Sequence, residues 1–273
     1  MEAEGSIPAL RFGAAVLSTI VIAALLGPAL VAGDPLLTDL GARLAAPSAD
    51  HLLGRDALGR DVLLRVLFGA RVSLVVALAT VTTSLVLGVT IGAAAGFAGG
   101  WLDEVTTRAI DILQAFPGLL LAIAFAAMLG PSLANVVVAL SLLGWTGYAR
   151  LTRAQIAAIR SREFVQAAVA LGASSVRILL RHGLPSAAPS LLVQATFGLS
   201  GAILAETSLS FLGLGAPPPT PSWGAMLDEG RAFLLVAPHV TLGPGLALTA
   251  TVLAVQLTGD GLRDWLDPRR SST

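Results

Sequence analysis

Long, uncharged apolar stretches are the feature of this 273-residue sequence that most restricts its fold. A helix needs about 20 apolar residues to cross the hydrocarbon of a bilayer, because every backbone polar group there has to be hydrogen-bonded within the protein. Six stretches of roughly that length follow one another, at about 12–32, 72–98, 109–130, 133–149, 187–207 and 240–259. They predict an all-α integral membrane protein with six transmembrane helices.

The composition supports this class. Apolar residues make up 55% of the sequence and charged residues 12%, which leaves too little polar surface for a soluble globule of this length. The formal net charge of zero argues against nucleic acid as a partner. All 17 basic residues are arginine, and cysteine is missing. A Walker A nucleotide-binding loop and a Schiff-base site both require lysine, so the sequence excludes both from this chain.

The segment 150–185, between the predicted fourth and fifth spans, is rich in arginine. It carries six arginines and one acid, Glu163, so its net charge is six minus one, or plus five. Short arginine-rich loops stay on the cytoplasmic side of a membrane. This loop is therefore predicted to be cytoplasmic, with both chain termini inside and the segment 33–71 outside, in a multi-pass protein of the inner or plasma membrane of the cell.

The same pattern predicts three parts of the chain. Residues 1–70 would hold an N-terminal anchor span, at about 12–32, and an external segment. Residues 71–268 would form a five-span core that includes the loop, and residues 269–273 a cytoplasmic tail. The first stretch lacks a basic head region and a small-residue cleavage pattern behind it, so it is predicted to be an anchor rather than a removed signal peptide.

Local signals within the loop predict two short helices. Residues 163–171 contain no glycine or proline, and Gly172 can stop a helix there. Ser174 or Ser175 can then cap a second helix at 176–182. The loop is therefore predicted to be a helix, a glycine turn and a helix.

The end of the loop and its side chains suit contact with another surface. Gly183 is predicted to end the second helix, with Pro185 in the first turn of the fifth span. Small residues allow a partner to approach closely, and arginines can pair with its carboxylates. These residues are Ala167, Ala168, Gly172, Arg177 and Arg181. Anionic lipid headgroups would hold the same arginines, so the residues alone leave protein docking and lipid contact equally open.

Three elements of this loop resemble the cytoplasmic coupling motif of ABC importer permeases. That motif has a Glu-Ala-Ala triplet, a glycine after three further residues and a closing Leu-Pro. The corresponding positions are Gln166-Ala167-Ala168, Gly172 and Leu184-Pro185. Gln166 replaces the usual glutamate and His182 replaces an isoleucine, so an ion pair made by the glutamate in relatives is not expected here. The predicted coupling residues are Gln166, Ala167, Ala168, Gly172, Arg177, Arg181, Leu184 and Pro185.

Further blocks resemble one branch of that family, the permeases of dipeptide, oligopeptide and nickel importers. They lie at 51–61, 108–117, 205–215, 221–227 and 259–268. The Gly-Arg-Asp signature after the first span is similar to that of the C-type partner within this branch. The resemblance implies a pore subunit that is not itself an enzyme and has no cofactor of its own.

The resemblance also implies the partners of the chain. Two ABC ATPase subunits, which use ATP and Mg²⁺, would bind the cytoplasmic loops of this chain and of a homologous sister permease. An external binding protein would deliver a peptide or a related small solute. The lipid bilayer surrounds the assembly, and the cargo itself is not specified by the sequence.

Glu206 and Ser208 are candidates for the translocation path. Glu206 lies near the outer end of the predicted fifth span, and a carboxylate within a membrane is a functional candidate. The alternative is a structural carboxylate that bonds to Ser208 or Ser210 or caps a broken helix. The structural role is the favoured interpretation.

Two pairs of charged residues have structural interpretations. Asp56 and Asp61, in the repeated Gly-Arg-Asp pattern, are predicted to be turn and helix-cap residues, with Asp61 starting a helix at Val62. An ion-binding role is the alternative, but no metal site is predicted because residues that select transition metals are scarce. Arg108 and Asp111 are predicted to form an intrahelical pair.

Two other functions are possible for a chain of this composition. An intramembrane serine protease would use Ser200, next to Gly198 and Gly201, together with His239. The predicted depth of Ser200 places it far from His239, which argues against this function. A secondary transporter would need paired broken helices with buried charges, and no clear repeat is visible in the sequence.

Overall fold

The computed structural model describes residues 6–31 and 33–266, and within that range it contains helices and no β-strand. The α-helices are α1 (Ser6–Leu30), α2 (Val62–Ala98), α3 (Gly100–Gln114), α4 (Gly118–Leu129), α5 (Leu133–Arg160), α6 (Glu163–Ala170), α7 (Ser175–Ile178), α8 (Leu184–Phe211), α9 (Trp223–Arg231) and α10 (His239–Leu266). A 3₁₀ turn spans Leu40–Ala42 and a π-helical turn spans Leu179–Gly183. The predicted tail at 269–273 and the last residue of the predicted first span, Ala32, lie outside the described residues.

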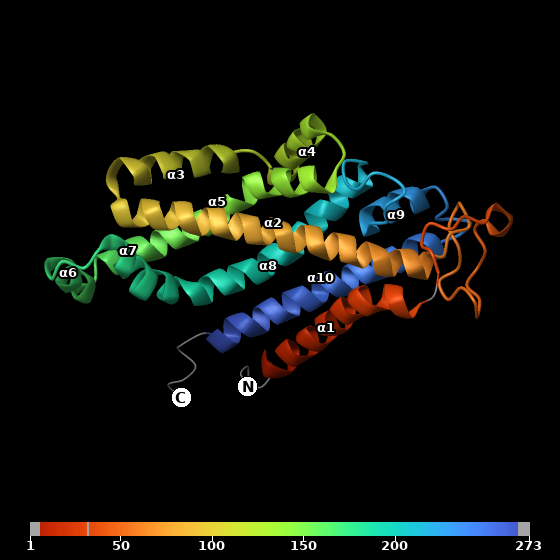
Figure 1. The fold of residues 1–273 in the computed structure, drawn as a ribbon, viewed down its shortest axis with the longest axis horizontal. Helices are drawn as coiled ribbons and strands as arrows, with labels where there is room; N and C mark the ends of the chain where they lie inside the picture. Colours follow the sequence, from red (N-terminus) through yellow and green to blue (C-terminus); the bar gives the residue numbers. More distant parts are fainter. Residues whose placement is uncertain (1–5, 32, 267–273) are drawn as a thin grey trace.

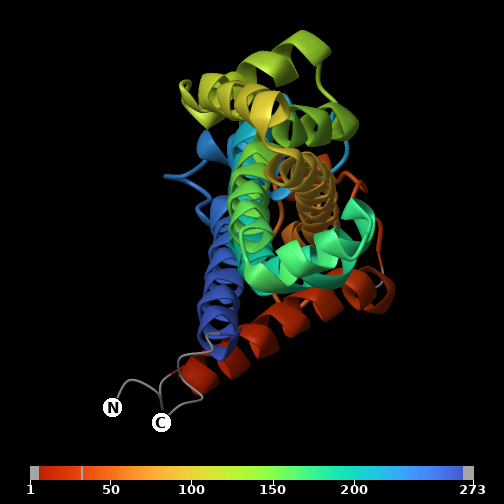
Figure 2. The same ribbon diagram turned by 90° about the vertical axis from the view of Figure 1, so that its left-hand side faces the viewer.

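Four long helices, α2, α5, α8 and α10, run along the long axis of the molecule (Figure 1). Helices α6 and α7 lie at one end of this bundle, whereas α9 and the segment 33–61 lie at the other. Figure 2 shows α3 and α4 on one side of the bundle and α1 on the opposite side. The arginine-rich segment and the predicted external segment are thus separated by the length of the bundle.

The all-α membrane fold is confirmed. Four helical runs are long and apolar enough to cross a membrane: Pro8–Gly27, Val62–Ala98, Ser175–Phe211 and His239–Leu266. The pair α3 and α4 gives a fifth if it is taken as one bent span. Helix α5 has 28 residues but is not among these runs, so the count of six spans stays a prediction.

The predicted third span at 109–130 is not a single straight helix. Helices α3 and α4 meet at 88°, with the break at residues 115–117. Pro117 explains the break, because a proline has no N–H for the helical ladder and pushes the residue before it away from helical backbone angles. The result is a helix that lies along α5, followed by one that turns across it.

Helices α2 and α5 share the most extensive helix–helix contact in the described part of the chain. Gly88, Gly92 and Gly96 recur every four residues and therefore lie on one face of α2. A Cβ atom at Gly88 or Gly96 would lie 2.5 Å from a carbonyl oxygen of α5, and one at Gly92 would lie closer. The three oxygens belong to Trp145, Ala149 and Arg153. Without side chains at these positions the two backbones touch, as small-residue interfaces in membranes allow.

Ion pairs attach α3 to α5. Arg150 contacts Asp111 at 3.0 Å and Arg153 contacts Asp103 at 2.8 Å. The predicted pair between Arg108 and Asp111 is therefore wrong, because Asp111 turns toward α5. Arg108 instead pairs at 2.6 Å with Glu104, one helical turn earlier.

The close contact of α2 with α5 predicts the effect of a single methyl group. Gly92→Ala would place that methyl against the carbonyl of Ala149, and we expect a loss of about 1–3 kcal/mol in the free energy of unfolding from overpacking. Gly245→Ala in α10 is the matched control, because the nearest atom, in Leu227, lies 3.8 Å from the added Cβ. Thermal unfolding of the detergent-purified variants measures the difference. Equal midpoints for the two variants would contradict the contact.

Candidate functional site

The arginine-rich segment is shorter than predicted at its start. Helix α5 continues to Arg160, so residues 150–160 are helical and not part of a loop. Arg150 and Arg153 hold α3, and Arg160 donates a hydrogen bond of 3.2 Å to the carbonyl of Ala98 at the end of α2. We name residues 161–185 the coupling segment, after the motif they resemble. The remaining arginines of the predicted loop, Arg162, Arg177 and Arg181, lie within it.

The helix, glycine turn and helix within the coupling segment are confirmed. After α6, Gly172 has a φ of +82°, a backbone conformation that glycine adopts readily. The N–H of Ala173 donates to the carbonyl of Ala168 at 3.0 Å, which closes the end of the helix. Of the two predicted caps, Ser174 is the one used: its Oγ accepts a hydrogen bond of 3.4 Å from the N–H of Arg177.

The predicted end of the second helix at Gly183 is wrong. Helix α7, the π-helical turn and α8 form one continuous run, Ser175–Phe211, of 37 residues. Pro185 would clash with the carbonyl four residues earlier in a regular helix. The wider π-helical turn just before it, in which Leu184 N–H donates to the carbonyl of Leu179, offers an arrangement that avoids this. Gly183 allows the turn to pack on Ile156, because an added Cβ would lie 2.8 Å from its Cδ1.

One face of the coupling segment is fixed to the bundle and the other is open. Val165 of α6 and Ile178 of α7 are buried with Ile159 at the end of α5. Away from this anchor, Leu171 is 89% exposed and Phe164 is 50% exposed. The segment therefore has a hydrophobic anchor inside and an apolar surface outside.

The predicted coupling residues are mostly accessible. Gln166, Ala167, Gly172, Arg177, Arg181 and Pro185 are exposed, and Ala168 and Leu184 are half-buried. Within the described part of the chain, neither Arg177 nor Arg181 forms an ion pair. Gln166 donates a hydrogen bond of 3.3 Å to the carbonyl of Ser161, so its amide stabilises the start of α6.

A groove of about 700 Å³ separates the coupling segment from the end of α5. The rings of Phe164 and His182 meet edge to face in it, with centroids 5.5 Å apart. Its lining consists of Ala154, Gln155, Ala158, Ile159, Arg162, Phe164, Arg181, His182, Pro185 and Ser186. The groove thus combines apolar contact area with two arginines.

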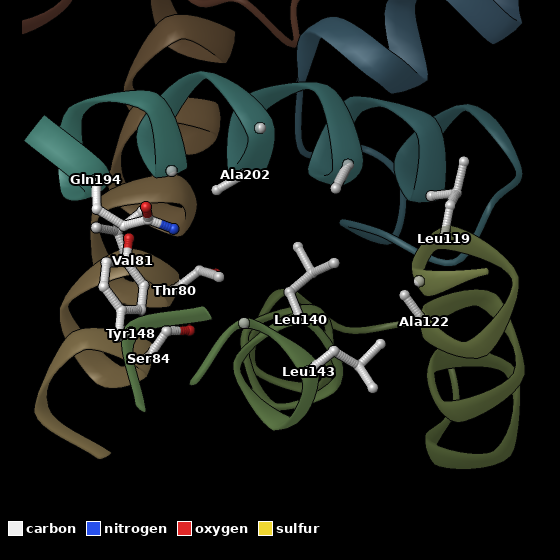
Figure 3. Close-up of a pocket in the computed structure, with 15 residues that line it drawn as sticks. Thr80, Val81, Ser84, Leu119, Ala122, Leu140, Leu143, Tyr148, Gln194 and Ala202 are labelled. Atoms are coloured by element: carbon white, nitrogen blue, oxygen red, sulfur yellow. The ribbon is translucent and has the colours of Figure 1, made fainter. Parts of the chain in front are cut away.

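A second cavity, of about 330 Å³, lies between α2, α4, α5 and α8 in the middle of the bundle (Figure 3). Its polar residues, Thr80, Ser84, Tyr148 and Gln194, gather at one end, and Leu119, Leu140 and Leu143 lie toward the other. Small residues of α8 form the remaining side: Gly198, Gly201, Ala202 and Ala205. Among the described residues that line this cavity, none is charged. This cavity was not predicted from the sequence. Gly198 and Gly201, which lie within the predicted fifth span, were the signal for it, because glycines leave space beside a helix.

The hydroxyl groups at the polar end of this cavity are unusual. Those of Thr80, Ser84 and Tyr148 are buried and have no hydrogen-bond partner among residues 6–31 and 33–266. The Tyr148 hydroxyl packs against Gly198 of α8, and a Cβ at Gly144 would lie 2.5 Å from Ser84 Oγ. A buried hydroxyl without a partner costs about 1–3 kcal/mol, so these groups are candidates for a role that the helix contacts alone do not explain.

Glu206 and Ser208 do not line this cavity. Glu206 is 0% exposed, and its Oε1 accepts a hydrogen bond of 2.7 Å from Ser210. The Ser208 hydroxyl donates at 2.8 Å to the carbonyl of Leu204 in its own helix. The bond to Ser210 matches the alternative interpretation of Glu206 as a structural carboxylate. A role of Glu206 and Ser208 in translocation stays a prediction.

The residues of the protease alternative do not meet. The Ser200 hydroxyl donates to the carbonyl of Phe197 at 2.8 Å and accepts from Gln256 of α10 at 3.1 Å. His239 lies at the far end of α10, where its Nε2 is 3.2 Å from the carbonyl of Arg55. The arrangement offers no base to activate the serine.

The end of the molecule opposite the coupling segment is held by charge pairs. Asp56 accepts from the N–H groups of Leu58 and Arg60 at 2.8 and 3.0 Å, and Asp61 caps α2 by accepting from Leu64 at 2.9 Å, which confirms their predicted turn and cap roles. Arg60 also contacts Asp56 at 2.6 Å. The segment before α2 is also linked to α9, and this link was not predicted from the sequence.

Glu229 of α9 supplies that link. It contacts Arg60 at 2.6 Å and Arg65 of α2 at 3.0 Å, and Arg65 lies 3.4 Å from Asp56. Arg65 is only 1% exposed. Two arginines and two acids therefore form a neutral, largely buried cluster that ties the segment before α2 to α9.

Comparison with known proteins decides the family. Residues 88–272, more than half of the chain, match the family described as binding-protein-dependent transport system inner membrane component. The chain belongs to this family. It is the permease subunit of an ATP-driven importer, in agreement with the resemblance of the coupling segment.

Individual relatives of this permease cover most of its length. The dipeptide transport system permease protein DppC of Alkalihalophilus pseudofirmus is 42% identical over 260 residues, which is 95% of this chain and 86% of the relative. The glutathione transport system permease protein GsiD of Pectobacterium atrosepticum is 45% identical over 226 residues, or 83% and 75% of the two chains. The similarity therefore includes the segment before residue 88.

The buried charge cluster predicts unequal effects for two neighbouring acids of the permease. Glu229→Ala would leave Arg65 with Asp56 at 3.4 Å as its nearest acid, and we expect a loss of about 3 kcal/mol in the free energy of unfolding. Asp228→Ala removes the more exposed pair with Arg231 and should cost less than about 0.5 kcal/mol. Thermal unfolding of the purified variants distinguishes the two. A smaller effect for Glu229→Ala than for Asp228→Ala would refute the role of the cluster.

Proposed function

We propose that the coupling segment docks an ATPase subunit carried by a separate chain, and that the permease forms half of a peptide pore together with a homologous sister permease. The observation that carries this proposal is the continuous helical run from Ser175 to Phe211. It joins the exposed segment directly to the cavity in the middle of the bundle, so a displacement of α7 would be carried to the cavity along one helical run.

The surface of the coupling segment suits a protein partner. Leu171 and Phe164 present exposed apolar area. Arg181 lines the same groove as Phe164, and Arg177 is also exposed. A protein surface with an apolar groove and carboxylates would match both features. The absence of lysine, and hence of a Walker A loop, supports the assignment of ATP and Mg²⁺ to that partner.

The remaining partners and the orientation follow from the family and the charge pattern. Two ATPase subunits would serve this chain and its sister, and an external binding protein would deliver cargo at the end that carries α9 and the segment 33–61. Arginines concentrated near the coupling segment support a cytoplasmic position for it and for both termini. The names of the relatives, for dipeptide and glutathione transport, support a short peptide as the cargo.

The intramembrane protease is the weaker candidate, because Ser200 is bonded to Gln256 and not to a histidine. A peptide permease accounts for the exposed coupling surface, which a protease would not need. Uptake that survives Ser200→Ala, together with no proteolysis by either form, would agree with this choice.

Docking through the outer face predicts a loss of ATPase binding without a loss of folding. Leu171→Asp and Arg181→Glu change exposed side chains, so their effects on stability should stay within about 0.5 kcal/mol. We expect each to reduce copurification of the ATPase subunits at least tenfold. Leu235→Asp is the matched control, since Leu235 is 99% exposed at the opposite end.

The outcomes of this experiment are distinct. ATPase copurification that is normal in Leu171→Asp and Arg181→Glu would refute the docking surface. A loss that also occurs in Leu235→Asp would show that copurification reports general damage to the permease. The alternative is that these residues contact anionic lipid headgroups. It would be favoured if the wild-type permease bound anionic vesicles through the same residues and the variants still bound the ATPase subunits normally.

A further inference from the structure

We propose that the cavity between α2, α4, α5 and α8 binds an uncharged, amphipathic part of the transported peptide. The peptide backbone would contact the polar end, and one apolar side chain would occupy the leucine end. The inference rests on the proposed function as a peptide permease and assigns a substrate contact to particular residues. The cavity has a volume of about 330 Å³, which is at the small end for ligand sites. It therefore has room for part of a peptide and not for a whole long peptide.

The polar end has the chemistry of a peptide amide partner. A hydroxyl group can donate and accept a hydrogen bond, and a glutamine amide can do both as well. A peptide unit offers one N–H and one carbonyl, so it can pair with either group. A free carboxylate or ammonium would find no opposite charge among the residues of the cavity. The site therefore favours the neutral backbone over the charged ends of the peptide.

The position of Tyr148 connects the site to α8. Its hydroxyl packs against Gly198 and has no hydrogen-bond partner in the described part of the chain. In this arrangement Gln194 is the exposed polar group of the cavity. A movement of α8 away from α5 would uncover the Tyr148 hydroxyl for the peptide. Because α8 continues from the coupling segment, such a movement would change the hydrogen-bonding groups that the cavity offers.

The apolar end has room for a side chain. Leu119, Leu140 and Leu143 line it, together with Ala122 (Figure 3). Gly201 of α8 borders the same cavity, and no atom lies within 4 Å of the position that a Cβ would take there. The empty space at Gly201 is thus available to a peptide side chain, and it can be filled by mutation without a clash at the Cβ.

Tyr148→Phe tests the polar end. The variant loses a hydroxyl that has no partner within the protein, so the thermal midpoint should stay the same or rise. We expect ATP-driven uptake of dialanine to fall roughly tenfold in proteoliposomes that contain the full complex with its binding protein. ATPase copurification should be unchanged. Full uptake by Tyr148→Phe would overturn the contact, and so would a lowered midpoint that accounts for the loss of uptake.

Gly201→Leu tests the apolar end. It fills the cavity, and we expect uptake of dileucine to fall at least fivefold more than uptake of dialanine. Gly245→Leu in α10 is the control, because Gly245 does not line the cavity and its added Cβ has 3.8 Å of space. Equal losses for the two peptides, or no loss, would overturn the proposal. A wild-type complex that binds its ATPases but takes up neither peptide would overturn the peptide assignment as well, whereas wild-type uptake with unaffected variants would overturn the cavity alone.

Discussion

The backbone contact between α2 and α5 is the constraint on which the other elements depend. Between helices in lipid the hydrophobic effect gives little drive for association, so close packing of small residues takes its place. Gly88, Gly92 and Gly96 bring the two helices together along three turns. Helix α3 is then tied to α5 by Arg150 and Arg153, and the coupling segment rests on the end of α5 through Ile159.

Helix α8 packs beside α2 and α5. It is not separated from α7 by the helix end that was predicted at Gly183. A proline normally ends or kinks a helix, yet Pro185 lies inside the run Ser175–Phe211. The π-helical turn at 179–183 lets the chain continue, and such turns occur often at functional sites. The second half of the coupling segment, from Ser175 onward, is therefore the first part of a membrane helix, whereas α6 and the turn at Gly172 precede that helix.

Local chemistry explains which parts of the structure were predictable. The helical class, the turn at Gly172 and the caps at Asp61 and Ser174 depend on residues close together in the sequence, and all were predicted. The pairing of Arg150 with Asp111, the link from Glu229 to Arg65 and the cavity depend on residues from separate helices. A single sequence does not show which residues of separate helices meet. The bend at residues 115–117 was missed because hydropathy is continuous through Pro117.

The buried charged groups at one end of the molecule have partners, whereas several buried hydroxyl groups in its middle have none among residues 6–31 and 33–266. At the end with α9, Arg60 and Arg65 meet Asp56 and Glu229 in a neutral cluster, and such a cluster resists separation because each ion would be left without a partner. Around the cavity, the hydroxyls of Ser84 and Tyr148 have no partners in the described part of the chain, so they lose no hydrogen bond within the protein when α8 moves away from α5. A continuous α8 that is displaced at the coupling segment should therefore separate from α5 beside the cavity before it disturbs the end with α9.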